Sequence, residues 1–145
     1  MTERLFEIKR EISVKTYDID FAGHVSNIVY LRWMEDLRLA IFDEYFPLVN
    51  LMDEGYLPII TESRIQYKKS VDLFDKPVGH MWIARMKAAS FDFEGEIIVA
   101  GEVTTRAFHT GVFVSSKTMK PVRVPRLIKE KCDELYQAKP SHSCR

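Results

Sequence analysis

Residues 28–45 form one long segment with helical periodicity. Most of the other patterned segments alternate between apolar and polar side chains, as β-strands do. On a helical wheel the charged side chains of the helical segment gather on one side, and a broad apolar arc opposite holds Tyr30, Trp33, Met34, Leu37, Ala40, Ile41 and Tyr45. Ser26 or Asn27 can cap its start, and Pro47 stops it soon after its end. A helix this apolar needs cover on more than one side, and one antiparallel sheet curled around it would supply that cover.

Strand patterns lie on both sides of this helix. Residues 6–14 alternate between apolar and polar side chains, which predicts a half-buried strand. Four further strand-like segments follow the helix: 59–71, 78–89, 91–100 and 103–115. Pro125 occupies a suitable first position for a short closing helix. The sequence therefore predicts an α+β fold, in which a curved antiparallel sheet wraps around a long central helix.

The length of 145 residues suits a single domain. We place that domain at residues 1–136 and expect a polar C-terminal tail at residues 137–145. The edge strands of an open sheet expose unpaired N–H and C=O groups, which favour pairing with another chain. We therefore expect an oligomer.

The composition argues against several classes of partner. Lys plus Arg (21) balances Asp plus Glu (21), so the chain lacks the positive charge that binds nucleic acid. No apolar run approaches the roughly 18 residues of a membrane span, and the first residues do not read as a signal peptide. We expect a cytoplasmic protein that has no membrane partner and free thiols at Cys132 and Cys144.

No pattern in the chain predicts a metal or a cofactor. The four histidines are scattered, and neither they nor the two cysteines have the spacing of metal ligands. The sequence also lacks a glycine-rich phosphate-binding loop. We therefore predict no metal site and no cofactor.

The segment before the helix carries most of the functional information. It reads Asp18-Ile19-Asp20-Phe21-Ala22-Gly23-His24-Val25-Ser26-Asn27-Ile28-Val29-Tyr30. This segment resembles the hotdog-fold acyl-CoA thioesterases of the 4-hydroxybenzoyl-CoA thioesterase type, whose pattern is close to Asp-x-Asp-x-x-Gly-His-Val-Asn-Asn-x-x-Tyr. Ser26 departs from that pattern, in which Asn is commoner, although Ser caps helices about as well.

The resemblance implies a hotdog fold and an active site that lies between two subunits, in dimers that often pair into tetramers. In the family the second Asp of the Asp-x-Asp pair is catalytic. By that match the catalytic residue falls on Asp20, and the oxyanion donor lies near Asn27.

The chemistry of a thioester leads to the same residues. Its leaving thiol ionises near the free-cysteine value of about 8.5, so it departs without a strong general acid. Asp20 could act as a general base on water, or attack the carbonyl to form a mixed anhydride. Free backbone N–H groups at the helix start, around residues 26–28, could hold the developing oxyanion.

Each candidate residue of this segment has both a functional and a structural interpretation. Asp20 could be a turn residue and Asn27 a helix cap. His24 could orient the carboxylate or the substrate, or only bond within the loop. Gly23 would permit a positive φ or a close approach to the acyl group. We expect the substrate-binding residues to be Gly23, Val25, Ser26, Tyr30 and Tyr67, with Tyr30 also a candidate for the core.

The sequence thus predicts an acyl-CoA thioesterase that releases coenzyme A and a carboxylic acid from an acyl or aryl thioester. Three alternatives stay open: a thioesterase for acyl carrier protein, a hotdog dehydratase, and a protein that binds acyl thioesters without turnover.

Overall fold

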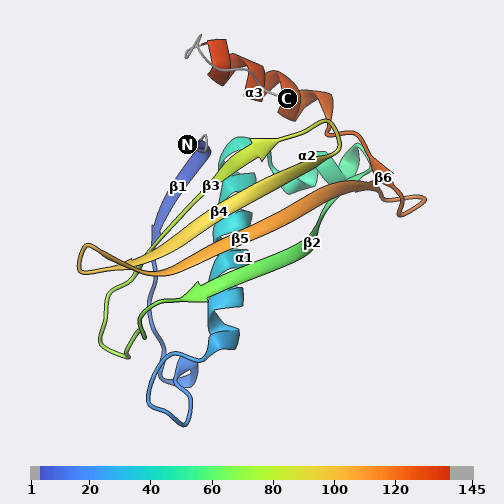
Figure 1. The fold of residues 1–145 in the computed structure, drawn as a ribbon. Coiled ribbons are helices and arrows are strands. Elements are labelled where there is room, and N and C mark those ends of the chain that lie inside the picture. Colours follow the sequence, from blue (N-terminus) through green and yellow to red (C-terminus); the bar gives the residue numbers. More distant parts are fainter. Residues whose placement is uncertain (1–3, 138–145) are drawn as a thin grey trace.

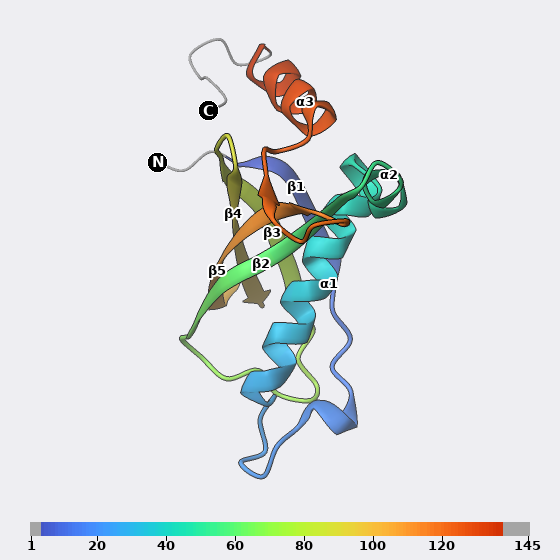
Figure 2. The ribbon, with the colours of Figure 1, turned by 90° about the vertical axis from the view of Figure 1, so that its right-hand side faces the viewer.

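The computed structural model describes residues 4–137, which form one antiparallel sheet and three α-helices. Figure 1 shows the sheet lying across the long helix α1 (Asn27–Tyr45), and Figure 2 shows α1 along one face of the sheet. The strands are β1 (Leu5–Glu11), β2 (Tyr56–Tyr67), β3 (Val78–Met86), β4 (Ser90–Val99), β5 (Glu102–Ser115) and β6 (Pro121–Val122). The predicted α+β class, with an antiparallel sheet and a long central helix, is confirmed.

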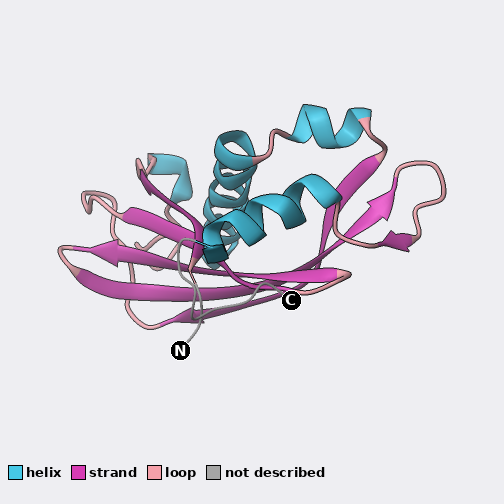
Figure 3. Cartoon of the chain, turned by 90° about the horizontal axis from the view of Figure 1, so that it is seen from above, coloured by secondary structure: helices cyan, strands magenta, loops and turns pink. Residues whose placement is uncertain are grey.

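The strand order is β1-β3-β4-β5-β2, with β6 paired to β5. This order makes β1 and β2 the two edges of the main path. Because β1 and β2 are consecutive strands at opposite edges, the segment with α1 and α2 carries the chain from one edge to the other. Viewed from above, the sheet curves and α1 stands on one side of it (Figure 3).

Helix α1 forms where the sequence predicts it, one residue longer at its start. It buries one face against the sheet, through Val29, Tyr30, Trp33, Met34, Leu37, Ile41 and Phe42. Two glycines on the strands allow this face of the helix to approach the sheet closely. A Cβ on Gly79 would lie 2.9 Å from the Leu37 methyls, and a Cβ on Gly95 would lie 3.2 Å from Met34 Sδ. The close fit between helix and sheet therefore depends on small residues at these two positions.

The predicted strands are all present, with shifted ends. The segment predicted at 59–71 is β2, which begins at Tyr56 and ends at Tyr67. Beyond it the chain leaves the ladder, since the amides of Lys68 and Lys69 both donate to Thr104 O and Val71 turns into the core. Long-range contacts of this kind have no signature in the local pattern.

Three elements were not predicted. The connector after α1 contains α2 (Leu48–Asp53), a helix of six residues that is too short to show a period. The chain also forms a single 3-10 turn, η1 (Thr16–Asp18), and the short strand β6.

The closing helix predicted from Pro125 is α3 (Arg126–Gln137), and beyond it the predicted tail lies outside the described residues. Cys132 is disulfide-bonded, so the prediction of a free thiol is wrong for this residue, whereas Cys144 lies outside the described part. None of the described helices is long and apolar enough to span a membrane.

Candidate active site at the start of α1

The loop from η1 to α1 lies at the lower end of the molecule, away from α3 (Figure 1). Main-chain hydrogen bonds close it into a tight turn: Asp20 N donates to His24 O at 2.9 Å, and Gly23 N donates to Asp20 O at 3.0 Å. Gly23 has a φ of +82°, a conformation that side chains rarely adopt. The positive φ expected at Gly23 is therefore present, and it lets the chain reverse between Asp20 and His24.

Asp20 is partly exposed, and one of its carboxylate oxygens is engaged within the loop. Oδ1 accepts a hydrogen bond of 2.9 Å from Ala22 N, which is the geometry of an Asx turn. Within residues 4–137 the other oxygen, Oδ2, has no hydrogen-bond partner. The turn fixes the carboxylate by Oδ1 and leaves Oδ2 available to a water molecule or a substrate.

The first turn of α1 offers amide groups without a side-chain cap. Ser26 stands at the predicted N-cap position, but its side chain makes no capping hydrogen bond. Its own amide donates to Asp18 O at 2.9 Å, so it is not available to a ligand. The amides of Asn27 and Ile28 come too early to find a partner inside the helix. These two exposed residues therefore present N–H groups at the positive end of the helix dipole.

A second loop, residues 68–77 between β2 and β3, packs against this turn. Val25 N donates to Val71 O at 2.9 Å, and the Tyr67 hydroxyl donates to Asn27 O at 3.3 Å. His24 Nδ1 lies 2.6 Å from Asp72 Oδ1. Sequence reasoning missed Asp72, because it lies 48 residues from His24 in a turn, where aspartate is ordinary.

The structure separates the expected substrate-binding residues into two groups. Val25 and Tyr30 are buried in the core. Burial raises the pKa of Tyr30, against the opposing effect of hydrogen bonds to the Val71 main chain and to Thr105. Gly23, Ser26 and Tyr67 are more accessible, and the Tyr67 ring packs edge-on against Tyr30 at 5.1 Å. Their roles in binding stay predictions.

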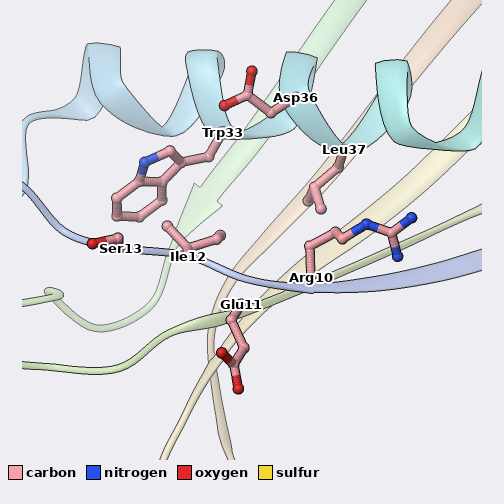
Figure 4. Close-up of a pocket in the computed structure, with 7 residues that line it drawn as sticks. All are labelled: Arg10, Glu11, Ile12, Ser13, Trp33, Asp36 and Leu37. Carbon is pink, nitrogen blue, oxygen red and sulfur yellow. The ribbon is translucent and has the colours of Figure 1, made fainter. Parts of the chain in front are cut away.

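Three cavities formed by residues within 4–137 are lined by residues other than Asp20. Figure 4 shows one of about 180 Å³, in which Trp33 and Leu37 point from α1 toward the segment at Ile12. Another, of about 250 Å³, lies between α1, α2 and the sheet and is lined in part by Arg38, Phe42 and Phe93. A third, of about 700 Å³, is formed by residues 11–14 and 73–78. Asp20 lines none of these three, so the walls of an acyl pocket around it are not supplied by these cavities.

The described residues contain no group of three or more His, Cys, Asp or Glu side chains that could hold a metal ion. The loop around Asp20 offers a carboxylate, an imidazole and main-chain amides.

Comparisons with known proteins identify the family of the chain. Residues 14–132 match the family described as the thioesterase-like superfamily. The chain is 29% identical over 117 residues to the Bacillus subtilis (strain 168) protein named "Putative acyl-CoA thioesterase YneP", covering 79% of this chain and 85% of that protein.

Solved structures share the whole architecture. The DHNA-CoA thioesterase of Staphylococcus aureus superposes with a TM-score of 0.84 at 20% identity, covering 96% of this chain and 97% of that one. The gentisyl-coenzyme A thioesterase BH1999 superposes with a TM-score of 0.76 at 25% identity, covering 83% of this chain and 98% of that one. These likenesses confirm the predicted hotdog arrangement of sheet and helix.

Proposed function

Because the chain belongs to the thioesterase-like superfamily and is thus a hotdog-fold thioesterase, we propose that it hydrolyses an acyl-CoA with Asp20 as the reacting carboxylate. The products are free coenzyme A and a carboxylic acid. The observation that carries this proposal is the position of Asp20 in a hydrogen-bonded turn of the loop that leads into α1, whose first amides have no side-chain cap.

The two parts of this site have complementary tasks. The amides of Asn27 and Ile28, with the helix dipole, polarise the thioester carbonyl and hold the negative charge that develops on its oxygen. Asp20 then acts through Oδ2 in one of two ways. It removes a proton from an attacking water, or it attacks the carbonyl carbon itself and forms an anhydride that water later cleaves.

The proposal includes a second copy of the chain, because none of the three cavities described above is lined by Asp20. β2 is an edge strand, and its residues 61–64 are exposed. Unpaired edge strands favour pairing with an identical strand about a two-fold axis. We infer a dimer that completes the acyl pocket, with tetramers formed from two dimers, in the cytoplasm.

We propose the class of the acyl group from the relatives. The two structural relatives named above act, by their titles, on dihydroxynaphthoyl-CoA and gentisyl-CoA, which are aromatic thioesters. An aryl-CoA is therefore the first substrate class to test, and fatty acyl-CoA and acyl carrier protein thioesters are the alternatives.

The proposal is tested by thiol release from a panel of aryl- and acyl-CoA substrates, with Asp20→Asn beside the wild type. We expect turnover to fall by at least about 100-fold, as for removal of a base or nucleophile. Binding of a nonhydrolysable substrate analogue should persist. Asp43→Asn, an exposed aspartate on the polar face of α1, is the matched control and should keep wild-type turnover.

Full activity of Asp20→Asn would refute the assignment of the carboxylate. Water loss from a hydroxyacyl-CoA without thiol release would instead support the dehydratase alternative.

A further inference from the structure

The three histidines of the described chain differ in what surrounds their ring nitrogens. His80 is buried and has a carboxylate at each nitrogen, Glu7 at 3.0 Å and Glu96 at 3.3 Å. His109 is buried and lies 2.7 Å from Ser63 Oγ through Nδ1. Only His24 combines a carboxylate at one nitrogen with a half-exposed ring. His24 is therefore the histidine that a substrate or a water molecule can reach.

The contact between His24 and Asp72 determines which nitrogen of the ring carries a hydrogen. The distance of 2.6 Å is that of a strong, charge-assisted hydrogen bond. An ionised carboxylate only accepts hydrogen bonds, so His24 Nδ1 must be the donor. In the neutral ring Nε2 then has no hydrogen and offers a lone pair, and within residues 4–137 it makes no hydrogen bond or ion pair.

His24 is also linked to Asp20 through the main chain. His24 O accepts the hydrogen bond from Asp20 N, so the two residues form the ends of one tight turn. The following residue, Val25, is held by Val71, the neighbour of Asp72. Asp72 and Val71 thus fix His24 in both its side chain and its main chain.

We propose that Asp72 is a positioning residue, which fixes His24 in the Nδ1–H form so that Nε2 accepts the proton of the hydrolytic water. This inference rests on the proposed thioester hydrolysis. The role of His24 belongs to the route in which Asp20 attacks the acyl carbon: the C–S bond breaks, its electron pair leaves on sulfur, and an anhydride with Asp20 remains. An O–H bond of water then breaks, its proton moves to Nε2, and the water oxygen bonds to the acyl carbon. The bond between that carbon and Asp20 breaks, and its electron pair returns to the Asp20 carboxylate.

Different results are expected if the pair of His24 and Asp72 has only a structural role. An exposed ion pair that only links two loops contributes little to stability, and its loss would not act specifically on turnover. An orienting carboxylate controls the tautomer of its histidine, and its replacement lowers turnover at nearly constant substrate affinity.

The test compares Asp72→Asn, His24→Gln and the double variant with the wild type, using thiol release from the best acyl-CoA substrate. In Asp72→Asn we expect kcat to fall about 10- to 100-fold, while KM changes by less than about 3-fold. In the His24→Gln background, Asp72→Asn should cause no further loss. Glu102→Gln, which breaks the exposed 2.6 Å pair between Lys69 and Glu102, is the control and should leave kcat unchanged.

Nitrogen NMR of the His24 ring gives a second measurement that needs no turnover. In the wild type at alkaline pH the hydrogen should reside on Nδ1, and in Asp72→Asn this preference should be lost. Wild-type kcat in Asp72→Asn, independent losses in the double variant, or an Nε2–H ring in the wild type would each overturn the inference.

The two proposals fail in distinguishable ways. If Asp20→Asn is inactive but Asp72→Asn has the kcat of the wild type, only the proposed role of Asp72 is refuted. If the wild type releases no thiol from any thioester, thioester hydrolysis falls and the role of Asp72 falls with it.

Discussion

Lowering the pH should destabilise this protein through one buried histidine on β5. His109 is only 2% exposed, and its Nε2 has no hydrogen-bond partner among the described residues. Burial, with a smaller effect of the Arg38 charge, lowers the pKa of His109 from 6.5 to about 4. The folded chain therefore keeps His109 neutral at a pH where the unfolded chain has already bound a proton.

The sign and size of the effect follow from this difference. Between pH 6.5 and 4 the unfolded state binds more protons at this residue, so stability falls as the pH falls. Each pKa unit corresponds to about 1.4 kcal/mol, and pH 5 lies about 1.5 units below the unfolded pKa. From pH 7.5 to pH 5 His109 should thus cost the folded state about 2 kcal/mol.

The assay is urea unfolding at fixed protein concentration, followed by the fluorescence of Trp33 and Trp82, which are both buried. His109→Leu removes the titrating group and keeps a side chain of similar size. Between pH 7.5 and pH 5 the free energy of unfolding of this variant should fall by about 2 kcal/mol less than that of the wild type. Leu39→Ala changes no titrating group and is the control; its free energy of unfolding should vary with pH as that of the wild type does. An identical loss in His109→Leu and in the wild type would refute the reasoning.

Two further predictions concern the packing of the core, and both are read from urea unfolding. In Gly111→Ala the new Cβ would lie 2.6 Å from the Phe91 ring, so we expect a loss of about 1–3 kcal/mol. Phe91→Leu added to it should recover part of that loss, and an unchanged midpoint in the single variant would contradict the packing. Leu37→Ala, at a fully buried position of α1, should cost about 2–5 kcal/mol. Leu39→Ala on the same helix is 41% exposed and should cost less than about 1 kcal/mol, so similar losses at both positions would be inconsistent with the observed face of α1.

Residues of the candidate site differ in how far the sequence could predict them. The turn at Asp20 and Gly23 is local, and its residue types select it, so the pattern located it correctly. Tyr30 is different, because its helical spacing fits the core and a pocket equally well. Trp33 lies one turn along the same helix, but the contact with Tyr67 on β2 comes from the tertiary fold.

By itself the sequence determined the order of the five long strands and α1, and the carboxylate turn before this helix, since periodicity, caps and turn residues act over a few neighbours. Only the tertiary structure decided that Asp72 meets His24, that α2 forms, and that β2 leaves the ladder at Tyr67. Those contacts join segments far apart in the chain, and their energy depends on which groups the folded sheet brings within hydrogen-bond distance.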